Sequence, residues 1–114
     1  MNVNKLIPKC IAKNEFTYKG LKNIPSKQGC YCITNINEDI LYIGLATNLA
    51  QRSLQHIENP DKHLMTKYGC PYYFCYCLLD KNADIFKTER GWLNLYELEH
   101  GELPPYNKIH SPVS

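Results

Sequence analysis

The sequence lacks any apolar run that approaches the roughly 18 residues of a membrane-spanning helix. Its first ten residues, MNVNKLIPKC, also lack the long apolar core of a signal peptide. Internal repeats and low-complexity segments are absent too, which excludes a repeat architecture. We therefore expect a cytoplasmic protein without a membrane partner.

What is present is a chain of ordinary globular composition. It has 114 residues, of which 44% are hydrophobic and 21% are charged. This length supports one hydrophobic core but not two, and the composition argues against bulk disorder. We expect a basic N-terminal extension over residues 1–26, followed by a single domain over residues 27–114.

The net charge of +2 hides an uneven distribution of charge. Residues 1–27 contain six lysines against Glu15, a balance of +5, whereas the remainder has 7 basic and 10 acidic side chains, a balance of −3. A basic arm of this kind suits binding to a phosphate backbone. It equally suits a solvated arm that keeps the protein soluble, and the sequence leaves both interpretations open.

Four of the six cysteines alternate along expected strands. Cys30 and Cys32 form one such pair and Cys75 and Cys77 another, so each pair points to one face of its strand. Without an export signal, free thiols are favoured over a disulfide framework. We expect buried, reduced cysteines that bind no metal. A zinc-structured interaction domain is the alternative, although zinc sites usually use loops and a longer Cys spacing.

Patterns of apolar residues and turn residues divide the chain into six expected elements. The proline-rich stretch at 103–107 is expected to be non-helical. The order β-β-α-α-β-α predicts an α+β fold, a small three-stranded antiparallel sheet flanked by helices. The expected elements are strands at 29–35, 40–44 and 72–79, helices at 47–58 and 84–100, and a short helix after Pro60.

The first two strands are expected to form a hairpin. A turn centred between Ile36 and Asn37 would place Tyr31 directly opposite Tyr42. One face of the sheet would then carry both tyrosines, and the other face would be wholly apolar and able to be buried.

Five short motifs follow one another along the chain. They are Gly29-Cys30-Tyr31, Tyr42-Ile43-Gly44, Asn48-Leu49 followed by Arg52 and His56, Glu89-Arg90-Gly91-Trp92-Leu93, and Leu103-Pro104-Pro105-Tyr106-Asn107. Together they resemble the motifs of the GIY-YIG nuclease family, over roughly residues 27–108. Leu45 departs from the family pattern, because many members carry a small or basic residue at that position.

The resemblance implies an endonuclease that hydrolyses phosphodiester bonds in DNA with one divalent cation, Mg²⁺ or another such as Mn²⁺. Glu89 would be the metal ligand, since a carboxylate suits magnesium, and Glu97 is the competing candidate. Arg52 lies four residues before His56, on the same face of one helix. It would pair with the scissile phosphate, or else form an ordinary surface salt bridge.

The same resemblance assigns roles to the remaining motif residues. Tyr31 would be the general base, with a pKa lowered by nearby cationic groups, and His56 would relay its proton or orient it. Tyr42 would position the water or the phosphate. Gly44 would allow close approach of backbone or substrate. Asn107 would bind the substrate or brace the helix that carries the glutamate.

A rival interpretation keeps the fold without the chemistry, as a catalytically silent nucleic-acid-binding module. The motifs are accompanied by no visible reader of base sequence. Specificity would then depend on a partner or on a homodimer, and the sequence leaves open whether DNA or RNA is the substrate.

Overall fold

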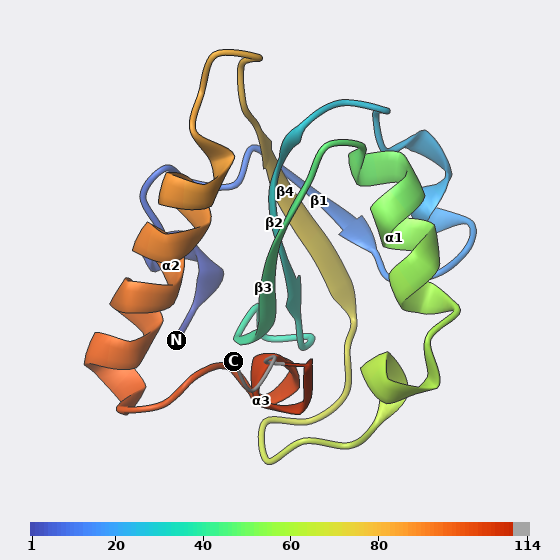
Figure 1. Cartoon of the computed structure of the whole chain (residues 1–114). Coiled ribbons are helices and arrows are strands. Elements are labelled where there is room, and N and C mark those ends of the chain that lie inside the picture. The colour runs from blue at the N-terminus through green and yellow to red at the C-terminus, as the bar shows by residue number, and fades with distance from the viewer. Residues whose placement is uncertain (111–114) are drawn as a thin grey trace.

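The computed structural model describes residues 1–110, and in Figure 1 a central sheet lies between two main helices. The fold is α+β, as the sequence predicts. The strands are β1 (Ala12–Glu15), β2 (Gly29–Thr34), β3 (Ile40–Ala46) and β4 (Tyr73–Leu78). The α-helices are α1 (Leu49–Ile57), α2 (Ile85–His100) and α3 (Pro105–His110), and the short 3₁₀ helices are η1 (Val3–Lys5), η2 (Gly20–Asn23) and η3 (Pro60–His63).

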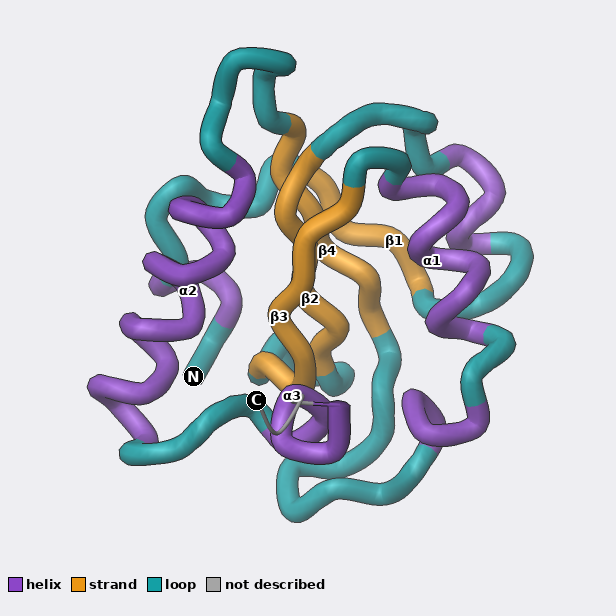
Figure 2. The backbone as a smooth tube through the Cα atoms, in the orientation of Figure 1, coloured by secondary structure: helices purple, strands orange, loops and turns teal. Residues whose placement is uncertain are grey.

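The four strands form one antiparallel sheet in the order β1-β4-β2-β3, drawn in orange in Figure 2. The expected count of three strands is therefore wrong. The fourth strand, β1, pairs with β4 from Ala12 opposite Tyr76 to Glu15 opposite Tyr73. Its sequence, AKNE, is poor in β-forming residues, so pairing with β4 rather than local propensity makes it a strand.

The segment before β2 packs into the hydrophobic core. Lys5 pairs with Glu99 of α2 at 2.7 Å, and Lys13 pairs with Glu38 at 3.5 Å. The expected boundary between residues 26 and 27 is therefore not a boundary of the core. Five apolar side chains of this segment are buried: Val3, Leu6, Phe16, Leu21 and Ile24.

The β2–β3 hairpin has the predicted faces but another register. Tyr31 pairs with Gly44, and Ile33 pairs with Tyr42, so the expected pairing of the two tyrosines is wrong by two residues. A shift of two keeps every side chain on its expected face. The cause lies at the turn, where the register changes after Ile33 and Glu38 adopts a positive φ of 66°.

We call the face of the sheet that packs against α2 the thiol face. Cys30 lies opposite Cys77, and Cys32 lies opposite Cys75, with Trp92 in the same cluster. All four thiols are free and buried, which confirms their predicted burial; their metal-free state stays a prediction. Burial raises the pKa of Cys30 and of Cys75 to about 12, so both thiols are protonated and unreactive at neutral pH.

We call the opposite face, which packs against α1, the tyrosine face. Figure 1 shows α1 and α2 on opposite sides of the sheet. Tyr31, Ile33, Phe74 and Leu49 belong to the buried cluster on this side. The ring of Tyr31 stacks on Phe74 with 4.9 Å between the centroids. Alternate residues of the same strands thus build two buried clusters, one on each face of the single sheet.

The two long helices have the predicted ends. Asn48 precedes α1, and its side chain accepts a hydrogen bond from the Gln51 backbone N–H. Asp84 caps α2 in the same manner, and Gly101 ends it in a left-handed conformation with φ of 72°. Within residues 1–110, no helix is both long enough and apolar enough to cross a membrane.

The proline-rich stretch 103–107 is partly helical, and the expectation that it is non-helical is wrong. α3 begins at Pro105. The first backbone N–H groups of a helix have no acceptor within the helix, so proline loses no hydrogen bond there, and its fixed φ suits the first turn. The short helix expected after Pro60 is present as η3.

Candidate active site

A buried tyrosine and a buried histidine form the centre of the site. Tyr31 of β2 is fully buried, and its Oη lies 2.5 Å from Nε2 of His56 on α1. The Tyr42 ring lies 6.0 Å from that of Tyr31 and 5.1 Å from that of His56, between centroids. β2, β3 and α1 therefore bring three predicted site residues into one ring cluster.

Burial dominates the electrostatics of both phenols. Burial is the main cause that raises the pKa of Tyr31 well above its ordinary value, and the positive charge of Arg52 opposes it. Burial likewise raises the pKa of Tyr42, against a hydrogen bond with Tyr31 and the same arginine. Arg52 thus lowers the pKa of Tyr31 as the sequence predicts, but burial outweighs it and the net shift is upward. A tyrosinate cannot be the resting form at neutral pH.

Gly44 is required by Tyr31 itself. The two residues are opposite each other in the β2–β3 ladder, and a Cβ atom at Gly44 would lie 2.5 Å from the Tyr31 Oη. The phenol therefore occupies the space that a side chain would need. The close approach that the sequence predicts is made by a tyrosine of the same protein.

Arg52 is exposed on α1, one turn before His56. It forms no ion pair with the side chains that the structure describes, so the surface salt bridge that the sequence left open is not formed there. Its charge acts on both Tyr31 and Tyr42. The guanidinium is thus near the ring cluster and accessible to an anion.

Glu89 lies on α2, which packs on the other side of the sheet. Its charge acts on both tyrosines, and burial raises its pKa while Arg90 opposes the shift. Glu97 is exposed and lies eight residues further along α2, a distance of about 12 Å along a helix axis. Of these two glutamates, only Glu89 acts on the pKa values of the tyrosines.

The surroundings of Glu89 suit a hydrated magnesium ion. Among residues 1–110, no group of three or more His, Cys, Asp or Glu side chains could hold a metal, so a cation at Glu89 would have few protein ligands. Magnesium commonly keeps several waters and takes one or two carboxylates. A partly buried carboxylate without an ion pair among the described side chains fits that requirement.

Asn107 braces strand β3. Its Oδ1 accepts a hydrogen bond from the Ile43 N–H at 2.9 Å, and its Nδ2 donates to the Ile43 carbonyl at 2.9 Å. β3 is an edge strand, so its outer backbone groups have no neighbouring strand to pair with. The Asn107 side chain supplies the hydrogen bonds of two of these groups. Asn107 thus supports β3, the strand that carries Tyr42 and Gly44, and not the helix α2 as expected.

Lys62 is near the site although the sequence analysis missed it. Its Nζ lies over the Tyr42 ring, 4.5 Å from the centroid, and the residue is 2% exposed. The stretch Pro60-Asp61-Lys62-His63 gives no local signal, because a polar stretch after a helix ordinarily faces solvent.

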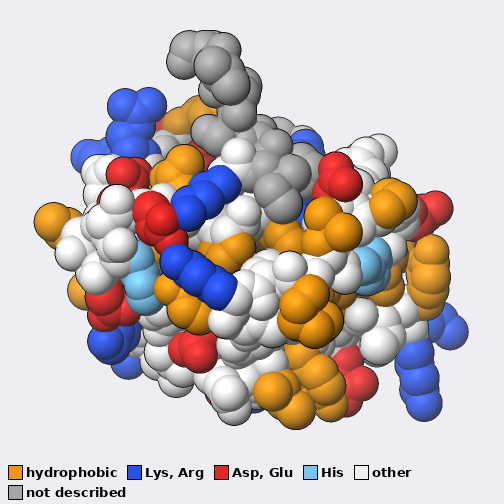
Figure 3. Space-filling model, turned by 90° about the horizontal axis from the view of Figure 1, so that it is seen from below, with side chains coloured by type: hydrophobic (Ala, Val, Ile, Leu, Met, Phe, Trp, Pro, Cys, Tyr) orange, Lys and Arg blue, Asp and Glu red, His pale blue; other side chains and the backbone are white. Residues whose placement is uncertain are grey.

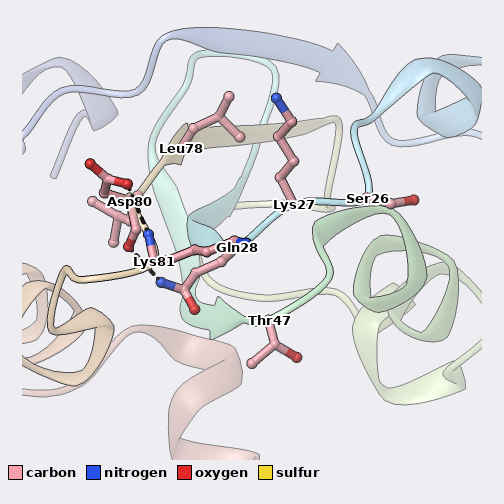
Figure 4. Close-up of a pocket in the computed structure, with 8 residues that line it drawn as sticks. Ser26, Lys27, Gln28, Thr47, Leu78, Asp80 and Lys81 are labelled. Atoms are coloured by element: carbon pink, nitrogen blue, oxygen red, sulfur yellow. Dashed lines mark hydrogen bonds between the residues drawn. The ribbon is translucent and has the colours of Figure 1, made fainter.

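A hollow of about 820 Å³ lies at the end of the sheet where the chain enters β2 and leaves β3 and β4. Figure 4 shows the side chain of Gln28 directed to Asp80, and Nε2 of Gln28 donates to the Asp80 carbonyl at 2.9 Å. None of the predicted site residues lines this hollow. The candidate site therefore lies outside it, with its ring cluster on the tyrosine face against α1.

On the face seen from below, Lys and Arg side chains are interspersed with Asp and Glu (Figure 3). Lys67 and Lys108 both pair with Glu102, each at 2.5 Å. Mixed charge of this kind does not offer a continuous basic surface to a phosphate backbone.

The fold and the match to a family model place the chain in a class of nucleases. Residues 27–101 match the family model described as the GIY-YIG catalytic domain, and the chain belongs to that family. The chain is also similar to UvrABC system protein C of Mycoplasma pneumoniae, with 33% identity over 89 residues. That match covers 75% of this chain and 13% of the relative, so the chain spans a small part of the relative's length.

Proposed function

We propose that the protein is a metal-dependent endonuclease that hydrolyses phosphodiester bonds in DNA. The observation that carries this proposal is the contact of the buried Tyr31 with His56 beside the half-buried Tyr42, where the charges of Arg52 and Glu89 act on both phenols. A phosphodiester requires positive charge at the phosphate and a group that accepts the proton of the attacking water.

Arg52 is the residue that binds the scissile phosphate. A planar guanidinium donates two parallel hydrogen bonds to phosphate oxygens and stays charged at all relevant pH values. Because Arg52 is exposed and forms no ion pair with the described side chains, binding the phosphate requires no existing bond to break.

Tyr31 acts as the base only in concert with His56. Because burial raises the pKa of Tyr31, the phenol accepts a proton from water only as it donates its own proton elsewhere. Nε2 of His56, at 2.5 Å from the Tyr31 Oη, is the acceptor in the tautomer that carries its hydrogen on Nδ1. The water oxygen then attacks phosphorus, one water proton moves to Tyr31, and the Tyr31 proton moves to His56. The bond from phosphorus to the leaving oxygen breaks in the same displacement, and that oxygen takes a proton from solvent water. Tyr42 holds the attacking water or the phosphate beside this pair.

Glu89 is the residue that would hold Mg²⁺ or Mn²⁺. When bound, the cation supplies Lewis-acid stabilisation of phosphate charge. A ligating carboxylate must be ionised, and burial raises the pKa of Glu89. Binding at Glu89 should therefore weaken, and cutting should slow, as pH falls through that raised value.

The test is cleavage of supercoiled plasmid by the purified protein, with magnesium and with a chelator. We expect nicking or linearisation only with magnesium. Glu89→Ala should abolish cutting and leave DNA binding largely intact, whereas Glu97→Ala, on the same helix, is the matched control and should cut normally. An inactive Glu97→Ala beside an active Glu89→Ala would show that the metal ligand is misplaced.

The same experiment decides between cutting and binding alone. If the unmodified protein binds DNA but cuts no substrate shape with any divalent metal, the silent nucleic-acid-binding module is the better account. The choice of DNA over RNA, a specificity partner or homodimer, and the cytoplasmic location stay predictions.

A further inference from the structure

Lys62 is buried where an apolar residue would be expected. It is 2% exposed, although its neighbours Asp61 and His63 are exposed. Leu64 and Met65, which follow directly, are 49% and 74% exposed. Burying an ammonium group is costly, whereas burying leucine or methionine is favourable. The fold therefore places the lysine inside against the ordinary preference of these side chains.

The Lys62 ammonium lies against the ring cluster of the candidate site. Its Nζ is 4.5 Å from the centroid of the Tyr42 ring, a geometry in which the ring quadrupole attracts a cation. It forms no ion pair with the side chains that the structure describes. Burial lowers the pKa of Lys62 to about 8, so the amine is still mostly charged at neutral pH.

The segment that presents Lys62 is fixed at both ends. The ring of His63 makes a hydrogen bond through Nε2 with the Ile57 carbonyl at 2.7 Å. The Oη of Tyr106, on α3, donates to the Leu64 carbonyl at 2.6 Å. These contacts attach η3 to α1 on one side and to α3 on the other, so the direction of Lys62 is set by the tertiary structure rather than by a loose loop.

We propose that Lys62 is a positioning residue of the nuclease site, which holds the Tyr42 ring by a cation–π contact and places a positive charge beside that ring. This inference rests on the proposed function. Lys62 acts through Tyr42 and does not need to touch the nucleic acid. It should therefore affect the rate of cutting more than the affinity for DNA. If the lysine stem only filled space, a methionine of similar length would replace it without loss.

The first test needs no cutting and follows the Lys62 amine by NMR titration in the free protein, with Lys62→Met to assign its signal. We expect a pKa well below that of ordinary lysine, little change in Tyr42→Phe and a further decrease in Tyr42→Leu, because only leucine removes the ring that stabilises the cation. An ordinary lysine pKa, or no effect of Tyr42→Leu, would overturn the proposal. The other charged or titratable groups on η3 and on the elements around it are Asp61, His63, Arg52, His56, Tyr106 and Lys108.

The second test compares cutting by Lys62→Met and Lys67→Met in single turnover. Lys67 also lies over a tyrosine ring, that of Tyr68 at 5.2 Å, but it is exposed and away from the candidate site, so it is the matched control. We expect Lys62→Met to cut about ten- to thirtyfold more slowly with unchanged DNA affinity, and Lys67→Met to cut normally.

The pH profile separates a charge effect from a packing effect. The Lys62 charge is present below its pKa and is lost as pH rises through about 8. Unmodified protein should show a decrease in rate there that Lys62→Met lacks. A folded Lys62→Met that cuts at the unmodified rate would overturn the proposal. If the unmodified protein never cuts, the proposed function fails, and the titration alone decides whether Lys62 and Tyr42 are coupled.

Discussion

The two faces of the sheet are made from alternate residues of the same strands, yet they differ in chemistry. On the thiol face, Cys30 and Cys32 are protonated thiols buried near Trp92. On the tyrosine face, Tyr31 lies between those cysteines in the sequence and contacts His56. Strand alternation thus allows one set of residues to supply a stable core while the adjacent set holds polar groups for chemistry.

The largest expected effect is a loss of stability when the packing of the thiol face is disrupted. Leu6 is fully buried there, in the segment before β2. Leu6→Ala should lower the free energy of unfolding by about 2–5 kcal/mol, measured by urea denaturation. Ile11→Ala is the control, because Ile11 is 68% exposed in the same segment and should change stability little. Equal, small effects of both would show that residues 1–26 are an arm outside the core.

The next largest expected effect is a loss of cutting by the tyrosine face without a loss of stability. Arg52→Ala should slow cutting by about 10²–10³-fold, as expected when a donor to developing negative charge is lost, with stability unchanged because Arg52 is exposed. Gln55→Ala is the matched control, since Gln55 lies on the same helix and is also exposed. Rates that fall equally in both variants would contradict a specific phosphate contact by Arg52.

The smallest expected effect concerns the N-terminal lysines. β1 is the edge strand opposite to β3, and two of the lysines already pair with acidic residues. Neutralising the five lysines should weaken DNA binding. It should also reduce the slope of log affinity against log salt concentration, by less than the roughly 0.9 per lysine expected if each lysine contacted a phosphate. An unchanged salt slope would leave the segment as a solubility device. The substituted residues are Lys5, Lys9, Lys13, Lys19 and Lys22.

Local signals in the sequence were sufficient for most of the fold. Patterns of apolar and turn residues identified β2, β3 and β4, and the expected helices at 47–58 and 84–100 lie within two residues of the ends of α1 and α2. β1 was missed because its strand character comes from pairing with β4. The hairpin register was wrong because the positive φ of Glu38 and the adjacent bulge are not visible in residue spacing.

Motif order predicted which residues would meet in the site, but not all of their contacts. Tyr31 and His56 are in contact, as the proposed relay requires. The bond between Asn107 and Ile43 joins residues 64 apart in the sequence, and the burial of Lys62 depends on α1 and α3 together. Contacts of this kind depend on tertiary packing and have no local pattern. The pKa of Tyr31 was misjudged for the same reason, because its burial outweighs the nearby charge.

The central claim is that the tyrosine face performs the chemistry, and the most direct measurement compares Tyr31→Phe with Cys32→Ala in single-turnover cleavage of plasmid DNA. Tyr31→Phe keeps the ring that stacks on Phe74 and loses only the hydroxyl. We predict that it remains folded and cuts about 10²–10⁴-fold more slowly, while folded Cys32→Ala cuts normally. A Tyr31→Phe protein that cuts at the unmodified rate would contradict this account.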